Sequence, residues 1–563
     1  MHRVGTRPTG EARRESGSAP SLVLGPLLRY VGESEATVWV ETSGACEVEV
    51  LGSRARSFRI EGHHYAIVVI KGLEPGSVTE YEVAVDGERH WPEPGSRFPP
   101  SVIRTLRPKG GISVVFGSCS VTAPLEPPYS LSRRDDRQGL GIGALYALAS
   151  RLVSELPADW PDLLLLVGDQ VYADELSPAT QQFIRTRRHI PRPPGEQVAD
   201  FEEYTRLYHE AWGHPLVRWL TSTVPTAMIF DDHDLHDDWN TSEAWIKQMR
   251  AKSWWEQRIV GAFMSYWIYQ HLGNLSPDEL AADKLMGQVT ATDDGTEAVR
   301  EFALRASHET AGSRWSYSRG LGGSRLVVID SRAGRVLKEG QRSMLDDAEW
   351  HWLERQLTGG VDHLLIATSV PLLLAPGLHW LEAWNEAVCA GAWGKRFAGI
   401  GEHLRQSFDL EHWAAFESSF TRLVELIRSV AAGERGPAPA SVGVLSGDVH
   451  HAYLAQTAFS KRSGVQSTVY QAVCSPFRHP LATHERLAVK AAMSRPATAI
   501  TRALARSAGV KDPALRWRLG RPTFDNQIAT LALAGREARL TIERAHGDWR
   551  HPMLDTVLDQ TLA

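Results

Sequence analysis

The chain has 563 residues, more than a single hydrophobic core usually supports, so we expect two domains. Its composition is 43% hydrophobic and 23% charged, as in ordinary globular proteins. A formal net charge of -6 argues against a dedicated nucleic-acid binder, which would carry a basic surface. We therefore expect no nucleic-acid complex, and the composition leaves the oligomeric state open.

The sequence shows neither a secretory signal nor an apolar stretch of transmembrane length. Its four cysteines are widely scattered and indicate no disulfide framework, which fits a reducing compartment. These features predict a cytoplasmic protein without a transmembrane segment.

Three regions are expected along the chain. Residues 1–20 carry charges without an apolar pattern, which predicts a disordered tail. Residues 21–105 alternate β-forming residues with turn residues, which predicts an N-terminal β-sandwich domain of immunoglobulin or fibronectin type. Prolines mark a linker near 91–101. From residue 106 to 550, strand and helix patterns follow one another, which predicts an α/β core domain.

Within the core region, periodicity predicts the main elements. The proline-rich stretch 191–194 is expected to kink a helical region, and the aromatic residues of 245–272 are interpreted as helix packing. We expect helices in 141–156, 176–222, 245–272 and 372–430, strands in 324–335 and 362–371, and a closing antiparallel hairpin in 526–545 that turns at Gly535.

Four short apolar runs are each followed by side chains that can bind a metal. Runs of this length predict strands buried on both faces, as in a parallel sheet covered by helices. The side chains are Cys119 after 112–117, Asp169 after 163–167, Asp231–Asp238 after 226–230, and Asp448 with His450 after 441–445. Because ligands bind at the carboxyl ends of such strands, we expect one site assembled from distant parts of the chain.

Gly168 and Asp169 form the strongest local signal. A carboxylate can bridge two cations and hold them close, although a helix-capping aspartate is the alternative. Tyr172 lies three residues further on, either as a phenolate ligand or as a packing residue. Cys119 is interpreted as a metal-bound thiolate, with a small buried thiol as the alternative.

The segment Asp231–Asp238 holds five Asp and two His in eight residues. Carboxylates this close cannot all stay ionised without a counter-charge, which a cation would supply. A solvated acidic loop is the alternative. We assign no role to His236, Asp237 or Asp238.

In two further segments, a pair of residues two positions apart is expected on the same face, because side chains of an extended chain alternate with a period of two. Asp448 and His450 have the spacing of two ligands to one metal. Asp330 and Arg332 have the same spacing, and the guanidinium could hold an anion such as a phosphate. The alternative for this second pair is a structural Asp–Arg ion pair.

At these residues the chain resembles the PhoD-like phosphatase (alkaline phosphatase D) family of the metallophosphatase, or calcineurin-like phosphoesterase, superfamily. Five motifs carry the resemblance and occur in the order found in the family. They are FGSCS (116–120), VGDQVYADE (167–175), IFDDHDLHDDW (229–239), VIDSR (328–332) and LSGDVH (445–450).

The resemblance implies a metallophosphatase-type αββα sandwich core with the N-terminal β-sandwich beside it. It also implies Fe(III) held by Cys119, Asp169 and Tyr172, with Asp169 bridging to Ca²⁺. The remaining expected metal ligands, Asp232, Asp448 and His450, match positions where other metallophosphatases place Asn and His. His233 matches the superfamily histidine that assists the leaving group. One departure is Asp234, where relatives commonly have Glu.

These features predict a metal-dependent phosphoesterase that hydrolyses a small-molecule phosphate ester. The expected catalytic residues are Asp169, His233 as the proton donor, and Arg332 as the holder of a phosphoryl oxygen. A phosphodiesterase or phospholipase-type hydrolase is the alternative within the same chemistry. A non-catalytic metal- or phosphate-binding protein and a β-sandwich adhesin are the alternatives outside it.

Overall fold

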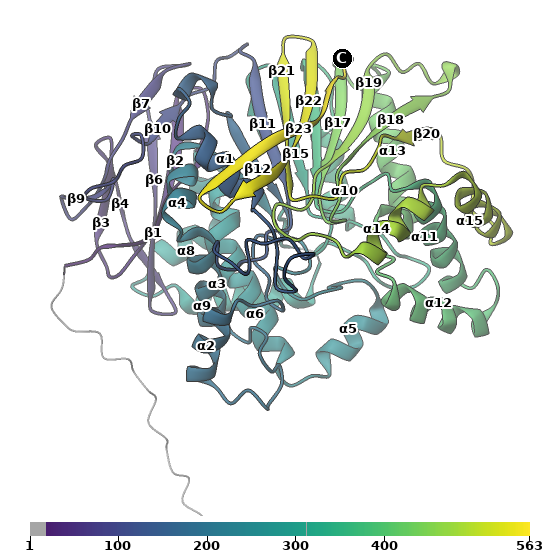
Figure 1. Cartoon of the computed structure of the whole chain (residues 1–563), viewed down its shortest axis with the longest axis horizontal. Helices are drawn as coiled ribbons and strands as arrows, with labels where there is room; N and C mark the ends of the chain where they lie inside the picture. The colour runs from purple at the N-terminus through teal and green to yellow at the C-terminus, as the bar shows by residue number, and fades with distance from the viewer. Residues whose placement is uncertain (1–18, 311) are drawn as a thin grey trace, which may run out of the picture.

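The computed structural model describes residues 19–310 and 312–563, so residues 1–18 of the expected tail lie outside the described residues. The fold is mixed α/β with several sheets. Figure 1 shows the N-terminal strands on one side of two large central sheets, with helices on both outer sides of these sheets.

From residue 19 to residue 104, the described N-terminal region consists of strands and the turns between them. They form two four-stranded sheets, in the orders β1-β2-β6-β5 and β4-β3-β8-β9, and a β10-β7 pair. A shared apolar cluster joins the two sheets, with Val38 and Val68 from one and Val48 and Val83 from the other. The strands are β1 (Leu22–Val31), β2 (Glu35–Thr42), β3 (Glu47–Val50), β4 (Ser53–Arg56), β5 (Phe58–Ile60), β6 (His63–Lys71), β7 (Val78–Glu80), β8 (Val83–Val85), β9 (Glu88–Trp91) and β10 (Val102–Arg104).

The first core sheet has six strands and contains three of the four predicted strand ends. Its order is β13 (Thr226–Ile229), β12 (Leu163–Val167), β11 (Ile112–Gly117), β21 (Gln527–Ala534), β22 (Glu537–Asp548) and β23 (His551–Thr561). Strands β11, β12 and β13 are parallel, so their carboxyl ends meet at one edge. The predicted hairpin turning at Gly535 is confirmed. Strand β23 continues this sheet beyond residue 550, where we expected the core to end.

The second core sheet has seven strands and contains the fourth predicted strand end. Its order is β14 (Tyr317–Leu321), β15 (Ser324–Ile329), β16 (His363–Thr368), β17 (Ser441–Ser446), β19 (Thr468–Val473), β18 (Tyr453–Phe459) and β20 (Leu515–Leu519). Strands β15, β16, β17 and β19 are parallel, so the exit of β17 lies at the carboxyl edge of this sheet.

The two core sheets pack face to face. Successive side chains of a strand point to opposite faces of its sheet, so each strand contributes to this interface and to the outer face. In β15, Leu326 and Val328 join the apolar cluster shared with the six-stranded sheet. Val327 and Ile329 instead pack with helices α10 (Asp347–Gln356) and α13 (Glu417–Ala431). Helices α1 (Ala144–Leu152) and α4 (Pro215–Thr223) lie against Leu164 and Leu166 on the far face of the six-stranded sheet. The core therefore has helix, sheet, sheet and helix layers.

The expected helical region 245–272 is divided rather than continuous. Helix α5 (Glu243–Arg250) is followed after a break by α6 (Trp255–Tyr266), and a π-helical turn covers Trp267–His271. The carbonyls of the last turn of a helical region have no partner within it. Here the carbonyl oxygens of Tyr269 and Gln270 each accept a hydrogen bond from the buried Arg29 guanidinium, both at 2.6 Å. The end of this helical region is therefore hydrogen-bonded to the N-terminal region through Arg29.

The other helices surround the sheets at the bottom and at the right of Figure 1. None of the helices in the described ranges combines the length and the apolar content that a bilayer span requires. The remaining α-helices of the described ranges are α2 (Pro178–Arg187), α3 (Phe201–Trp212), α7 (Pro277–Ala282), α8 (Lys284–Thr290), α9 (Thr296–His308), α11 (Pro376–Cys389), α12 (Lys395–Ser407), α14 (Thr483–Ala492) and α15 (Arg495–Ser507).

Candidate metal centre

The chain turns sharply just after the strands that carry the expected ligands. Cys119, Asp169, Asp448 and His450 have φ values of 59°, 53°, 66° and 52°. This left-handed conformation is uncommon for residues other than glycine, and it concentrates at functional sites where the surrounding structure enforces it. Four such residues after three strands direct their side chains toward one region.

Two glycines let these turns approach one another. A Cβ atom added to Gly168 would lie 2.7 Å from the Cβ of Asp231, and its φ of +113° is also unfavourable for other residues. A Cβ atom added to Gly447 would lie 2.1 Å from the Oγ of Ser118. That same oxygen accepts a hydrogen bond from the amide of Asp448 at 2.9 Å, which joins the two core sheets at the site.

The first group of potential ligands surrounds Asp169. The Cys119 Sγ atom lies 3.3 Å from Asp169 Oδ2, and the Tyr172 hydroxyl donates to the same oxygen at 3.4 Å. One ligand atom each of Cys119, Asp169 and His450 lie within 4.8 Å of one another. The structure thus brings a thiol, a carboxylate, a phenol and an imidazole together from three strand ends.

The second group shares Asp169 with the first. Ligand atoms of Asp169, Asp231 and Asp232 also lie within 4.8 Å of one another. Among the described residues, the buried atoms Asp169 Oδ1 and Asp231 Oδ2 have no hydrogen-bond partner, whereas Asp232 Oδ1 lies 3.3 Å from the Arg332 guanidinium. Leaving buried carboxylate oxygens unpaired is costly, so this donor set fits bound cations. Asp169 is the member that both groups have in common.

The protonation preferences of these side chains agree with that fit. Burial, and then Asp231, raise the pKa of Asp169 well above its usual range, and burial with Asp169 does the same for the Cys119 thiol. A cation would reverse this preference by favouring the charged forms. Burial and His479 hold the pKa of His450 well below 6.5, so its imidazole is neutral, the form that binds metals.

Arg332 is completely buried among carboxylates. Its guanidinium forms an ion pair with Asp231 and lies 2.6 Å from Glu411, 3.3 Å from Asp232 and 3.7 Å from Asp448. These contacts make it a counter-charge, whereas the sequence predicted a side chain open to a phosphate. The sequence also offered an ion pair between Arg332 and Asp330, but the ion pairs of the guanidinium are with other carboxylates. Asp330 Oδ1 accepts a hydrogen bond from the backbone amide of Arg332 at 2.8 Å.

His233 forms a pair with Asp174 at the edge of the site. Its Nδ1 lies 2.9 Å from Asp174 Oδ1, and its Nε2 lies 3.6 Å from Asp237 Oδ1. Burial disfavours the charged ring, but Asp174 and Asp232 raise the pKa of His233 well above 6.5. The side chain is 15% exposed, so a protonated Nε2 is available at the surface of the site.

Asp234 has a structural role within the acidic segment. Its carboxylate accepts hydrogen bonds from the backbone amides of Asp169 at 2.9 Å, Gln170 at 3.2 Å and Asp231 at 2.9 Å. Burial raises its pKa to about 7 despite these bonds. Asp234 therefore holds the two ligand-bearing loops in register.

The backbone amides of two unassigned residues of the segment hold neighbouring carboxylates, and the Asp237 carboxylate also groups with ligand atoms of Asp232 and His233 within 4.8 Å. The amide of Asp237 donates to Asp174 Oδ2 at 2.7 Å, and the amide of Asp238 donates to Asp232 Oδ2 at 2.9 Å. The ring of His236 points away from the carboxylates and stacks on Trp254 at 6.1 Å.

Two histidines near the site were not predicted. His412 lies between Glu382 Oε1 at 2.7 Å and Asp448 Oδ2 at 2.9 Å. His479 Nδ1 lies 3.0 Å from His450 Nδ1. His479 follows the end of β19, so the strand-end pattern could have identified it. His412 and Glu382 lie in the helical region 372–430, where no strand end marks them.

The family model described as PhoD-like phosphatase matches residues 144–288, which include Asp169, Tyr172 and the acidic segment. A second family model, described as a domain of unknown function (DUF7800), matches residues 19–103. A search of curated proteins found no match. The resemblance to PhoD-like phosphatases is confirmed over the matched residues.

Two solved structures are similar to this chain. The structure of PhoD has a TM-score of 0.59 and 12% sequence identity, and the similarity covers 97% of this chain and 91% of that chain. The structure of the purple acid phosphatase PPD1 from yellow lupin (Lupinus luteus) seeds has a TM-score of 0.45 and 10% identity, and it covers 96% of this chain and 74% of that chain. The first similarity shows a shared fold.

Proposed function

We propose that this chain is a metal-dependent phosphoesterase that hydrolyses small-molecule phosphate esters. The observation that carries the proposal is the junction at Asp169, where two groups of ligand atoms meet and two buried carboxylate oxygens, Asp169 Oδ1 and Asp231 Oδ2, lack hydrogen-bond partners among the described residues. The match to the PhoD-like phosphatase model supports the reaction class.

The residues of the two groups divide naturally between two cations. Fe(III) suits the group containing Cys119, Asp169 and Tyr172, because phenolate and carboxylate are hard donors and the resemblance assigns iron to these positions. A neighbouring Ca²⁺ would share Asp169 and take oxygens from Asp232 and Asp448. His450 would complete the first group. Asp231 joins this proposed set because one of its oxygens is buried without a partner.

When bound, such cations supply Lewis-acid activation of the phosphate and of an attacking water. The protein residues do the rest. The His233 imidazolium, held through Nδ1 by Asp174, would donate the Nε2 proton to the leaving ester oxygen. Arg332 would neutralise Asp231 and Asp232 and so fix their orientation, and contact with a phosphoryl oxygen would require it to give up one of these partners.

We propose the same division of the chain that the sequence predicts. Residues 21–105 would be a β-sandwich of immunoglobulin or fibronectin type, supported by its two sheets around a common apolar cluster. The core would be the metallophosphatase domain, extended to β23. The region of the chain matched by the second family model supports a boundary near residue 103.

The test combines elemental analysis with turnover of a panel of phosphate monoesters and diesters. We expect purified protein to contain two cations per chain and to hydrolyse at least one ester class, with loss of activity after chelation and recovery after metal is returned. Bound metal without hydrolysis of any ester would favour the alternative of a non-catalytic metal- or phosphate-binding protein. The ratio of the monoester and diester rates decides between a phosphomonoesterase and a phosphodiesterase.

A further inference from the structure

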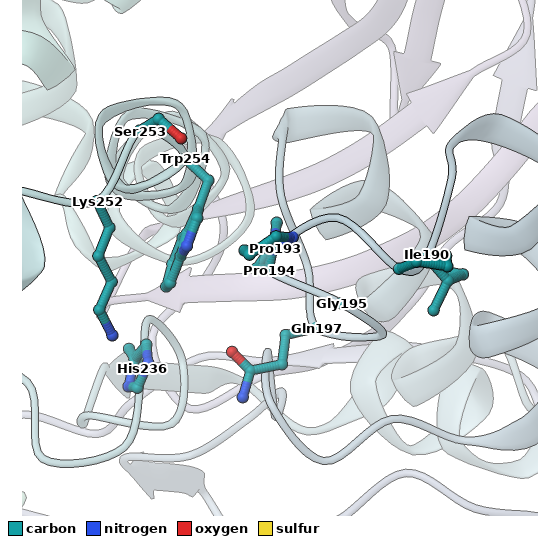
Figure 2. A pocket seen from close by; sticks show the side chains of 10 residues that line it. Ile190, Pro193, Pro194, Gly195, Gln197, His236, Lys252, Ser253 and Trp254 are labelled. Atoms are coloured by element: carbon teal, nitrogen blue, oxygen red, sulfur yellow. The ribbon is translucent and has the colours of Figure 1, made fainter.

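An open pocket of about 660 Å³ lies beside the loop that carries His233. Figure 2 shows the Trp254 ring between Lys252 and the Pro193–Pro194 turn, with His236 and Gln197 below the ring. We call it the ring pocket. Its lining residues are Ile190, Pro191, Pro193, Pro194, Gly195, Gln197, His236, Lys252, Ser253 and Trp254.

A short segment of the chain connects the ring pocket to His233, the proposed proton donor. The amide of His236, which lines the pocket, donates to the carbonyl oxygen of Asp232 at 2.5 Å. The next amide, of Asp237, donates to Asp174, the partner of His233. One lining residue of the pocket therefore belongs to the same hydrogen-bonded segment as His233, which would protonate the leaving ester oxygen.

The chemistry of the ring pocket differs from that of the metal centre. Its described lining consists mainly of proline rings, an indole and an imidazole, and contains no carboxylate. Lys252 is the charged member, and its Nζ lies 5.4 Å from the centroid of the Trp254 ring. Flat apolar faces with few polar groups suit a planar ring.

The walls of the ring pocket are held in place by two arginines. Arg258 donates to Gln197 Oε1 and to the carbonyl oxygen of Leu235, both at 2.8 Å, and its guanidinium lies 5.7 Å from the Trp254 ring centroid. Arg188 donates to the carbonyl oxygen of Gly195 at 2.5 Å. These bonds join the proline-rich turn, the acidic segment and the start of α6, so the Trp254 face is preorganised.

We propose that the ring pocket binds a planar aromatic ring in the ester group of the substrate, as the base of a nucleotide provides. The phosphate would lie at the metal centre while the ring stacks on Trp254. This inference rests on the proposed function for the position of the phosphate, but the preference for a ring rests on the pocket itself.

AMP and ribose 5-phosphate test the proposal because they share the sugar and the ester oxygen and differ in the base. For the wild type we expect kcat/KM for AMP to exceed that for ribose 5-phosphate about tenfold, as stacking of one base on an aromatic ring provides. Trp254→Ala should bring this ratio near one. The matched control is Trp549→Ala, which removes a half-buried indole lying 4.9 Å from Arg550 on the β22–β23 connection, and it should leave the ratio unchanged.

If Trp254→Ala lowers kcat/KM equally for both compounds, so that their ratio is unchanged, the proposal for the ring pocket is wrong. Calorimetric titration of both compounds into the full chain, loaded with Fe(III) and Ca²⁺, separates this outcome from failure of the proposed function. If neither compound is hydrolysed but AMP binds about tenfold more tightly and loses this advantage in Trp254→Ala, the pocket stands and the phosphoesterase proposal fails. Equal affinities of the wild type for both compounds would refute the pocket.

Discussion

The candidate metal centre and the contact between the N-terminal strands and the core both contain buried charged groups, but these groups are better paired with opposite charges in the contact. There, Glu41 of β2 is 1% exposed. Its carboxylate lies 3.0 Å from His63 Nδ1 and 2.7 Å from His209 Nε2, and it accepts a hydrogen bond from the Tyr269 hydroxyl at 2.8 Å. Glu202 adds a second carboxylate 2.8 Å from His63 Nε2.

The protonation preferences of the two regions run in opposite directions. Burial opposes the charge of Glu41, but its histidine partners hold its pKa at about 2. Burial and neighbouring carboxylates instead raise the pKa of Asp169. Equal burial thus gives opposite results, because two histidines pair with Glu41, whereas the ion pairs of the described residues include none with Asp169. A structural ion cluster is recognised by its complete pairing, and a metal centre by its missing partners.

Replacing Asp169 tests the candidate metal centre, and we expect it to have the largest effect, on metal content and on hydrolysis. Asp169→Asn keeps the size but removes the charge that two cations would share, so their repulsion rises. We expect loss of metal and a fall in hydrolysis of at least about a thousandfold. The fold should persist, because strand β12 is held by apolar packing. Elemental analysis, turnover and circular dichroism check this prediction, and normal metal content with normal turnover would contradict the mechanism.

Replacing Glu41 tests the ion cluster between the N-terminal strands and the core, and we expect it to lower the free energy of unfolding. Glu41→Gln leaves two histidines without their shared carboxylate, and removing one partner of a buried ion cluster costs about 3–5 kcal/mol. Denaturant unfolding measures this loss, and metal content should stay at the wild-type level. Glu49→Gln is the matched control, since its ion pair with Arg54 is solvent-exposed and contributes at most about 1 kcal/mol. Loss of metal in Glu41→Gln would show that the two regions are not independent.

The pH dependence of stability sharpens the comparison with a smaller effect. Burial lowers the pKa of His63, but bonds to Glu202 and Glu41 outweigh it and raise the value from 6.5 to about 9. A raised pKa contributes stability that is complete below pH 6.5 and is lost as the pH rises through 9, at most about 3 kcal/mol here. His63→Gln should flatten this fall in the free energy of unfolding between pH 6 and 10. A wild-type curve without that fall would refute the assignment.

Glu41 gives the complementary limit on the acid side. Its pKa falls from 4.5 to about 2, so its contribution is present above pH 4.5 and is lost as the pH falls through 2. The two groups together place the highest stability of this contact between pH 4.5 and 6.5.

The sequence alone determined the features that local patterns encode. Continuous apolar runs predicted the strands β11, β12, β13 and β17, and the residues after them contained the potential ligands. A buried strand needs an unbroken apolar run, and its end needs a turn, so both leave a signal within a few residues. The motif order gave the resemblance for the same reason.

Only the tertiary structure decided which polar residues of these motifs have which partners. The five Asp of the acidic segment share one sequence signal, yet the carboxylate of Asp234 holds the loop of Asp169. Glu41 pairs with His209, 168 residues away. Arg332 meets Asp231 across the junction of the two core sheets. Whether a charge is paired or left for a cation depends on such distant contacts, and these exist only once apolar packing has brought the strand ends together.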